Sequence, residues 1–321
     1  MAQTGGEPLL SLKISRRCMN DCVFCSEQAR RDNRAPFPGP AEVRDAIGAA
    51  RRRGITRISL LGGEPTLHPD LPLFIRHARG LGFSMIHLCT NGRRLAVKGY
   101  LDTLIAEGLT HLDTSIHADS VALAERISRS KGSFAEQADG LARAAAAFGE
   151  GLITLTTNTV IHRANQKRLA RIVAFLGRQG VPYRSLYLAR PAGAARTGAA
   201  AVLPDLGALR DQLAATFAGV DDAEESTLQT FGVPFCLLPE GRIDRAVEFR
   251  GRFRPIHQRL GETGARLPAL DAMHEAVRGR VDRPRGLPPR CRGCTIAGVC
   301  PRPDPLHLRL SGDRWISPVV V

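Results

Sequence analysis

The chain has 321 residues, of which 43% are apolar, and its formal net charge is +14. This length suffices for one large domain or for a large domain with a small one, and the composition is typical of a globular protein and excludes a disordered chain. No stretch approaches the roughly 18 apolar residues of a membrane-spanning helix. No targeting segment fits in front of the first cysteine of interest, Cys18. We therefore expect a cytoplasmic protein with no membrane partner.

Apolar strand patterns alternate with helical patterns along the first two thirds of the chain. Strands are predicted at 9–15, 55–62, 84–90, 110–118, 152–161 and 184–189. Helices are predicted at 39–54, 70–80, 96–107, 119–148, 165–180 and 205–218. Six strands, most of them followed by a helix, indicate parallel βαβ units in an α/β fold. Right-handed crossovers would curl these units into a barrel or a partial barrel.

The pattern changes after residue 220. Between Arg242 and Arg292 the chain holds thirteen arginines and six acidic residues, with many glycines and prolines. The final stretch, 305–321, alternates around a Ser-Gly-Asp sequence and is predicted to form a β-hairpin. We expect a core domain at 1–220 and a small C-terminal domain at 221–321.

The basic charge fits two interpretations. One is a solvated, arginine-rich surface, and the other is an acidic partner such as a nucleic acid, a phosphorylated substrate or an acidic peptide. We find no helix-turn-helix or aromatic RNA-binding signature, so a nucleic acid partner is not expected. The arginine-rich segment itself is either a substrate-binding mouth or a solvated basic loop.

Three cysteines, Cys18, Cys22 and Cys25, follow the first predicted strand with the spacing C-x3-C-x2-C. Cytosolic cysteines are more often metal ligands or reactive thiols than disulfides. In a parallel α/β barrel this loop lies at the C-terminal face, where active sites are built. A closed zinc site needs four protein ligands and a [4Fe–4S] cluster has four irons, so three thiolates leave one metal position open. The spacing alone also allows three buried or zinc-binding cysteines that happen to cluster.

The residues around these cysteines favour the iron–sulfur interpretation. The stretch "CMNDCVFC", together with "LLGGEPTLHPDL" after the second strand, resembles the radical S-adenosylmethionine (radical SAM) superfamily over residues 8–195. The resemblance implies a partial (β/α)6 TIM-like barrel and a [4Fe–4S] cluster bound by the three cysteines and by S-adenosylmethionine (SAM). It also implies reductive cleavage of SAM to a 5′-deoxyadenosyl radical, which takes a hydrogen atom from a substrate carbon. A reducing partner such as flavodoxin or ferredoxin is expected.

The same resemblance implies which residues bind SAM. Gly62, Gly63, Glu64 and Pro65 match the segment that meets the SAM ammonium group, where glycines permit close backbone approach and Glu64 offers charge. Weaker matches at strand ends and in the cysteine loop add Phe24, Ser115, Arg126 or Arg129, and Asn158. For the strand-end residues, ordinary strand-end polarity is the alternative.

Three more side chains near strand ends are candidates without an assigned role. His117 replaces an acid found in many relatives, and it is either a substrate contact or a structural histidine. Tyr187 and Arg190, at the end of the sixth strand, are candidate pocket residues. The sequence names no catalytic acid or base.

A second cysteine set lies in the last third of the chain: Cys236, Cys291, Cys294 and Cys300. A four-cysteine zinc ribbon usually pairs two C-x2-C knuckles, and this set contains only one. The C-x2-C-x5-C run resembles part of the twitch/SPASM extensions of radical SAM enzymes, although it has four cysteines where a full SPASM domain has seven. We predict one fully ligated auxiliary [4Fe–4S] cluster, with zinc as the alternative. The eighth cysteine, Cys89, is predicted to be a buried apolar thiol.

These features predict a radical SAM oxidoreductase or synthase that oxidises or cross-links a C–H site in a ribosomal peptide or a small natural product. The alternatives are a dehydrogenase or epimerase of a sugar or aminocyclitol, an RNA-modifying radical SAM protein, and a non-catalytic iron–sulfur electron-transfer protein. Because seventeen residues precede Cys18, we expect any recognition of a leader peptide to need a separate protein.

Overall fold

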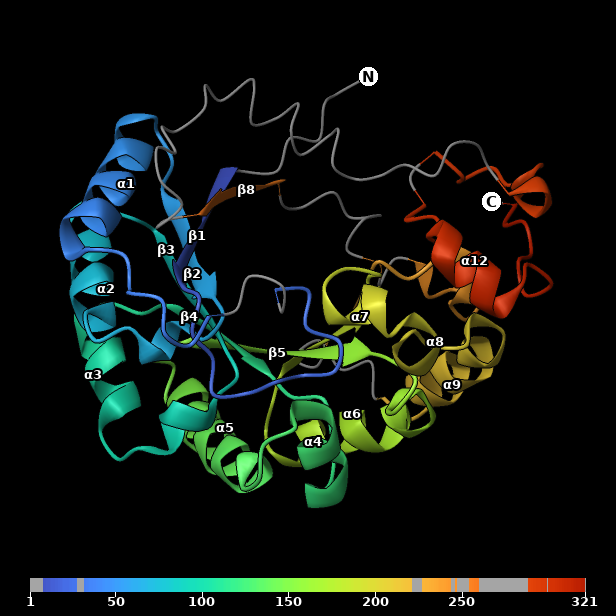
Figure 1. Cartoon of the computed structure of the whole chain (residues 1–321), viewed down its shortest axis with the longest axis horizontal. Helices are drawn as coiled ribbons and strands as arrows, with labels where there is room; N and C mark the ends of the chain where they lie inside the picture. Colours follow the sequence, from blue (N-terminus) through green and yellow to red (C-terminus); the bar gives the residue numbers. More distant parts are fainter. Residues whose placement is uncertain are drawn as a thin grey trace.

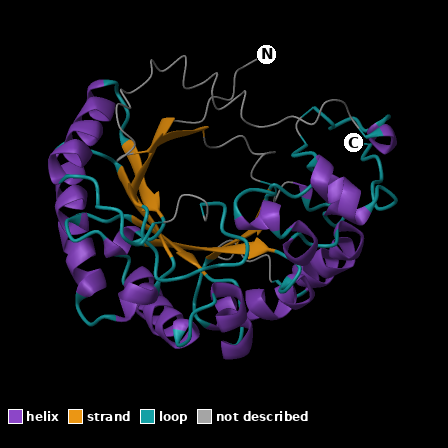
Figure 2. Cartoon of the chain, in the orientation of Figure 1, coloured by secondary structure: helices purple, strands orange, loops and turns teal. Residues whose placement is uncertain are grey.

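The chain is described by a computed structural model over residues 8–27, 32–220, 227–243, 246, 254–259, 288–298 and 300–320. Its strands form one parallel sheet of eight strands in the order β7-β6-β5-β4-β3-β2-β1-β8. The sheet curves into an arc, and helices α1 to α6 form a layer on its outer side (Figure 1). Figure 2 shows the same two layers, with the strands lining the inner side of the arc. The predicted α/β partial barrel is therefore confirmed.

All six predicted strands are present, and two more extend the sheet at its edges. The strands are β1 Pro8–Ser15, β2 Arg57–Gly62, β3 Met85–Thr90, β4 His111–Ser115, β5 Thr154–Ile161, β6 Tyr183–Leu188, β7 Thr227–Phe231 and β8 Arg254–Arg259. The sequence did not predict β7, which pairs with β6, or β8, which pairs with β1. The strand β8 lies inside the arginine-rich segment, where no alternation of apolar residues marks it. Its pairing depends on the exposed edge of β1, which is remote in sequence.

Helices lie between the strands at nearly the predicted positions. They are α1 Pro40–Arg52, α2 Leu71–Gly80, α3 Tyr100–Glu107, α4 Val121–Ser128, α5 Ser133–Gly149, α6 Leu169–Arg178, α7 Ala194–Thr197, α8 Ala199–Val202, α9 Leu206–Ala218 and α12 Pro305–Ser311. Single 3-10 turns are η2 Pro65–Leu67, η3 Arg93–Ala96, η4 Gln166–Arg168, η5 Phe235–Leu237 and η7 Pro289–Cys291. The helical stretch 119–148 is divided because Arg129 takes a left-handed conformation (φ 51°) and ends α4. None of the helices in the described ranges combines the length and the hydropathy needed to cross a membrane.

The predicted C-terminal β-hairpin is wrong. Residues Pro305–Ser311 form α12 instead. Asp304 caps this helix by accepting a hydrogen bond from the backbone N–H of Leu306 at 2.8 Å, and Pro305 occupies the first helical position. These two local signals favour a helix start and outweigh the apolar alternation that suggested a strand.

Alternation along the strands gives the sheet two different faces. The outer face carries apolar side chains such as Leu12, Leu60 and Leu88, which are fully buried against the helices. Burying each such side chain contributes roughly 1.5 to 3 kcal/mol to stability. The inner face is mostly polar because successive residues of a strand point to opposite sides. It carries Lys13, Ser59, Cys89, Asp113, Ser115, Thr156, Asn158, Ser185 and Tyr187.

A second apolar cluster joins the last part of the chain to the barrel. Leu209 and Leu213 of α9 pack in this cluster with Phe235, Trp315 and Ile316. Three half-buried cysteines, Cys236, Cys291 and Cys300, border it. The C-terminal cysteines thus rest on an apolar base that also includes strand residues of β6 and β7. A domain division at residue 220 stays a prediction.

Candidate cofactor site

The loop after β1 carries the three N-terminal cysteines at the C-terminal edge of the sheet. Burial, and then the charges of Cys18 and Cys25, raise the pKa of Cys22 to about 12. Three thiols that influence one another in this way fit a shared metal group, because a bound cation stabilises the thiolate form. Within the described ranges, no three Cys, His, Asp or Glu side chains already converge at metal-binding geometry. The loop therefore carries three sulfur donors that are not assembled into a closed metal site.

The end of helix α4 holds one side of this loop. The backbone N–H of Asp21 donates to Ser128 O at 2.8 Å, and that of Val23 donates to Ile127 O at 3.0 Å. Carbonyls in the last turn of a helix lack partners within the helix, so the loop satisfies groups that would otherwise need water. Arg129 adds an ion pair to Asp21, with 3.5 Å between Nη1 and Oδ2.

The two arginines predicted near SAM lie in different surroundings. Arg129 is beside the cysteine loop through its ion pair with Asp21. Arg126 points toward the loop after β5, where its Nη2 donates to Ala164 O at 3.5 Å. The structure therefore brings Arg129, and not Arg126, into contact with the cysteine loop.

The turn after β3 holds the other side of the loop. Arg93 donates from Nη1 to Asn20 Oδ1 at 2.7 Å and to Ser130 Oγ at 2.8 Å. Asn91 donates from Nδ2 to Met19 Sδ at 3.0 Å, and its distance to Cys18 Sγ is 3.9 Å. Sequence reasoning did not single out either side chain. The available signal was their position directly after a strand, with Asn91 inside "LCTNG" (88–92) and Arg93 following it.

The glycines of the GGEP turn fit closely against the start of the cysteine loop. A Cβ atom on Gly62 would lie 2.4 Å from Ser15 O, and one on Gly63 would lie 2.5 Å from Arg17 O. Gly62 also has φ 145°, which side chains rarely tolerate. The backbone N–H of Gly63 donates to Ser15 O, and that of Glu64 donates to Arg17 O, both at 2.7 Å. These glycines are thus needed for contact between two protein segments.

The carboxylate of Glu64 is fully buried and completely engaged. Its Oε1 accepts hydrogen bonds from Thr66 Oγ1 and Thr90 Oγ1, each at 2.6 Å, and its Oε2 accepts from the N–H of Asn91 at 2.8 Å. Burial raises the pKa of Glu64, and these hydrogen bonds oppose that change. The expected contact between Glu64 and the SAM ammonium group stays a prediction. In the structure, Glu64 joins the GGEP turn to the end of β3.

Ser115 and Asn158 are register partners on the inner faces of β4 and β5. Asn158 Nδ2 donates to Asp113 Oδ1 at 3.1 Å and lies 3.9 Å from Cys89 Sγ. Burial raises the pKa of Cys89 well above its ordinary value, so the thiol is neutral near pH 7, as predicted for a buried thiol. Its neighbours on the inner face, such as Asn158, are polar, and strand alternation alone does not tell which face is polar.

Phe24 packs the cysteine loop onto two histidines. Its ring meets His117 edge-on at 4.7 Å and stacks on His162 at 5.0 Å. Burial lowers the pKa of both histidines to about 3, so both are neutral near pH 7. His117 Nδ1 accepts a hydrogen bond from the N–H of Val160 at 3.2 Å, which favours its structural alternative.

The predicted pocket residues of the sixth strand differ in position. Tyr187 lies on the inner face and stacks on Phe231 of β7, with 5.0 Å between ring centroids. Arg190 lies beyond the strand and is exposed. An aromatic pair therefore stands at the C-terminal ends of β6 and β7.

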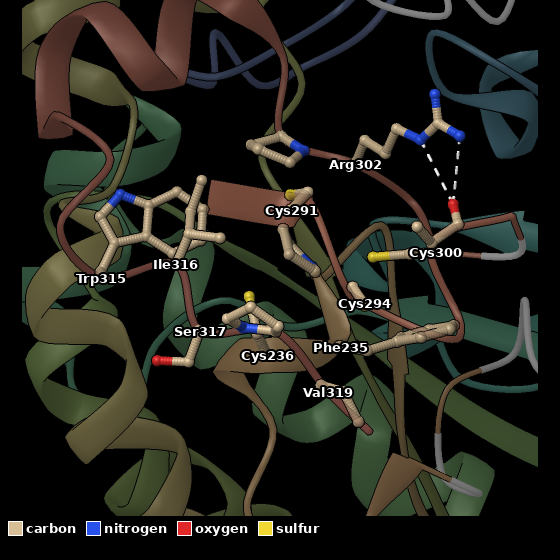
Figure 3. A pocket seen from close by; sticks show the side chains of 14 residues that line it. Phe235, Cys236, Cys291, Cys294, Cys300, Arg302, Trp315, Ile316, Ser317 and Val319 are labelled. Carbon is tan, nitrogen blue, oxygen red and sulfur yellow. Dashed lines mark hydrogen bonds between the residues drawn. The ribbon is translucent and has the colours of Figure 1, made fainter. Parts of the chain in front are cut away.

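The four C-terminal cysteines line one pocket (Figure 3). Burial raises the pKa of Cys236, Cys291 and Cys300, and the charges of neighbouring thiols raise each of them further. Apolar side chains, including Phe235 and Trp315, form much of the wall. A four-thiol set with an apolar wall fits a soft metal or an iron–sulfur cluster.

A family model described as the Radical SAM superfamily matches residues 12–176, which span the cysteine loop, the GGEP turn and strands β2 to β5. The chain belongs to the radical SAM superfamily. Membership implies a [4Fe–4S] cluster and SAM, and it agrees with the open set of three thiols beside the GGEP turn. The resemblance seen in the sequence is thus confirmed for the barrel.

The radical SAM relatives include enzymes named PqqA peptide cyclase. The one from Xanthomonas campestris pv. campestris (strain B100) is 31% identical over 227 residues, covering 70% of this chain and 57% of the relative. The one from Streptomyces rochei is 31% identical over 162 residues, covering 50% and 43%. The chain therefore spans less than three fifths of the length of these relatives.

Solved structures with the same fold include SuiB from Streptococcus suis. SuiB bound to S-adenosylmethionine aligns with a TM-score of 0.65 at 18% identity, covering 95% of this chain and 74% of SuiB. SuiB bound to precursor peptide SuiA aligns with a TM-score of 0.65 at 17% identity, covering 95% and 73%. At these identities the alignments establish the shared radical SAM fold.

Proposed function

We propose that this chain is a radical SAM enzyme that oxidises or cross-links a C–H site in a ribosomal peptide. The observation that carries the proposal is the three-thiol loop joined to the GGEP turn at the C-terminal edge of the barrel. Two comparisons support the peptide: the relatives named PqqA peptide cyclase, and the shared fold with SuiB, which was solved bound to a precursor peptide. The net charge of +14 suits a peptide with acidic residues.

The proposed cofactor residues fall into two groups. Cys18, Cys22 and Cys25 would hold the [4Fe–4S] cluster. The SAM side would be formed by Phe24, Gly62, Gly63, Glu64, Pro65, Ser115, Asn158 and either Arg126 or Arg129, and the ion pair of Arg129 with Asp21 of the cysteine loop supports Arg129. When bound, cluster and SAM supply the electron and the deoxyadenosyl group that together remove a hydrogen atom from a substrate carbon.

The chain's own residues prepare this site in three ways. Glu64 fixes the turn after β2 to the end of β3 through its buried hydrogen bonds. Arg93 and the end of α4 hold the cysteine loop in place. Phe24 and its two histidine neighbours close the loop against β4 and β5 with neutral, water-excluding rings. Fixed dipoles and excluded water are the conditions under which a reactive intermediate is protected.

The four C-terminal cysteines would hold an auxiliary [4Fe–4S] cluster, with zinc as the alternative. Their shared pocket and its apolar wall support a closed four-thiolate site. The same apolar cluster contains Leu186 of β6 and Leu228 of β7, so the site is built on the barrel wall. A fully ligated cluster there would accept one electron and make the net reaction an oxidation. A flavodoxin or ferredoxin would supply the electron for the first cluster.

The test is anaerobic reconstitution of the protein and of a Cys18/Cys22/Cys25→Ala variant. We expect about eight irons per wild-type chain and about four per variant chain. Wild type with dithionite and SAM should form 5′-deoxyadenosine, and the variant should form none. With SAM and a small-peptide fraction of the source cell, wild type should remove two hydrogens from a peptide, read as a mass decrease. About four irons with bound zinc would exclude the auxiliary cluster, and SAM cleavage without any altered peptide would exclude the peptide function.

A further inference from the structure

Asp113 is a carboxylate on the inner face of the barrel that the proposed cofactor contacts do not use. It lies in the middle of β4 and is 9% exposed. Its Oδ1 accepts one hydrogen bond, from Asn158 Nδ2 at 3.1 Å. In the described part of the chain no hydrogen bond or ion pair is recorded for its Oδ2. One carboxylate oxygen therefore remains able to accept a proton from a molecule on the inner face.

The position of Asp113 relates it to the proposed SAM contacts. Ser115 lies two residues further along the same strand and on the same face, about 6.6 Å toward the C-terminal edge at 3.3 Å per residue. Asn158, the register partner of Ser115, holds Asp113 by its amide. Asp113 thus lies nearer the N-terminal end of β4 than Ser115 does. A substrate bound inside the barrel, below SAM, would contact the inner face at this level.

The register neighbours of Asp113 on the adjacent strands offer it no counter-charge. On β3 its register partner is Cys89, and on β5 its register partner is Thr156. Neither is cationic, and Asn158 is a neutral amide. The other titratable or charged groups along this face include Lys13, whose Nζ is ion-paired with Glu27, and Arg57 at the N-terminal end of β2, together with Glu64, His87 and His111. Of these, burial lowers the pKa of His87 to about 4 and also lowers that of His111, so both histidines are neutral near pH 7.

We propose that Asp113 is the catalytic proton acceptor for the substrate, taking the proton that the substrate radical loses when it is oxidised. This inference rests on the proposed function. The substrate class it implies is a peptide whose reacting C–H carbon bears an N–H, O–H or S–H group. That group would contact Asp113 Oδ2 while the C–H bond faces the SAM layer.

The proposed step balances in atoms and electrons. Removal of a hydrogen atom from the C–H bond leaves a carbon radical. Asp113 takes the proton from the neighbouring heteroatom, and one electron passes to an acceptor of the iron–sulfur class. The carbon and the heteroatom then share a double bond, and the peptide has lost two hydrogens and two electrons. A cross-linked product loses the same two hydrogens, with the second proton taken from the carbon of the new bond.

Burial supports this role because it raises the pKa of Asp113 to about 7, with the hydrogen bond from Asn158 opposing the change. A proton acceptor is most effective when its pKa lies near the working pH. The acceptor must be ionised, so product formation should increase about tenfold per pH unit below this pKa and level off above it.

The first test needs no substrate. The reconstituted protein carrying [γ-13C]aspartate is titrated by NMR, and the Asp113 signal is assigned as the one lost in Asp113→Asn. Asp113→Glu serves for assignment if Asp113→Asn does not fold. We expect a titration midpoint between about 6 and 8, and a midpoint below about 5, near the ordinary value, would overturn the inference.

The second test measures product and 5′-deoxyadenosine together, using the small-peptide fraction as the probe. Asp113→Asn should lose the two-hydrogen product at least about 100-fold, while 5′-deoxyadenosine changes less than about threefold. The matched control is Thr156→Val, the register neighbour on the same face, which should leave both within about threefold. Equal product from Asp113→Asn and wild type overturns the inference alone. Wild type that cleaves SAM but alters no peptide overturns the proposed function instead, before any variant is compared.

Discussion

Arg93, in the turn after β3, donates a hydrogen bond from Nη1 to Oδ1 of Asn20 in the middle of the three-cysteine loop, at 2.7 Å. The same guanidinium also bonds Ser130 and Glu136, so it ties the loop to the start of α5. A loop that must present three thiols to one metal group loses conformational freedom, and such contacts reduce that entropic cost. Arg93 is therefore a positioning residue for the predicted cluster.

Replacing Arg93 should weaken the N-terminal cluster. We expect Arg93→Gln to lose the contacts to Asn20 and Ser130 and to retain iron about 10 to 100 times less tightly. The measurement is the rate of iron loss to a chelator, with the electron paramagnetic resonance signal of the reduced cluster. Arg94→Gln is the matched control, because Arg94 instead lies over the Tyr100 ring, 5.1 Å from its centre. Equal iron retention in both variants would show that the cysteine loop binds the cluster without the hydrogen bonds of Arg93.

Replacing Glu64 by glutamine should destabilise the fold itself. The hydrogen-bond partners of the carboxylate are all donors, and a glutamine NH2 group would face one of them without an acceptor. An unsatisfied buried polar group costs about 1 to 3 kcal/mol. Urea unfolding of the apoprotein should show a loss of this size for Glu64→Gln. Glu107→Gln, which removes a surface ion pair with Arg76, should change little. Wild-type stability in Glu64→Gln would mean that the buried network is not formed.

Gly63→Ala should disrupt the contact between the GGEP turn and the cysteine loop. The added Cβ would lie 2.5 Å from the backbone oxygen of Arg17, and backbone cannot move aside as a flexible side chain can. We expect a loss above about 2 kcal/mol in unfolding free energy, together with loss of SAM cleavage. Gly149→Ala in helix α5 has no atom within 4 Å of the new Cβ and should be neutral or stabilising. Full SAM cleavage by Gly63→Ala would contradict the close packing.

Asp113 should also make the stability of the protein depend on pH. Its folded pKa, about 7, is raised above the unfolded value, so its stabilising contribution is complete below about pH 4 and is lost as the pH rises through 7. Asp113→Asn removes the titration. Thermal unfolding should therefore show the variant equal to wild type near pH 4 and more stable above pH 7, by at most about 4 kcal/mol. A constant difference across this pH range would contradict a raised pKa.

The sequence predicted the strands and helices of the barrel well because both depend on local patterns. Strands β1 to β6 follow apolar runs, and α1 begins at Pro40 after Gly39 as the helix signals indicate. The predicted C-terminal hairpin was wrong because two local signals conflicted. The apolar alternation suggested a strand, whereas the Asp304 cap and Pro305 favoured a helix. The strands β7 and β8 were missed because their pairing depends on the edges of β6 and β1.

The chemistry of the site was evident from short motifs, whereas its contacts were not. The three cysteines lie within one short stretch, Cys18 to Cys25, and the GGEP turn lies within another, Gly62 to Pro65, so each motif can be seen in the sequence alone. The bond between Arg93 and Asn20 joins residues 73 positions apart, and the one between Asn158 and Asp113 joins residues 45 apart. Such contacts follow from the side-by-side pairing of parallel strands, which brings residues from distant segments to the same end of the sheet. Only the tertiary structure decided that Glu64 joins the GGEP turn to the end of β3 and that Cys89 and Asp113 share the polar inner face.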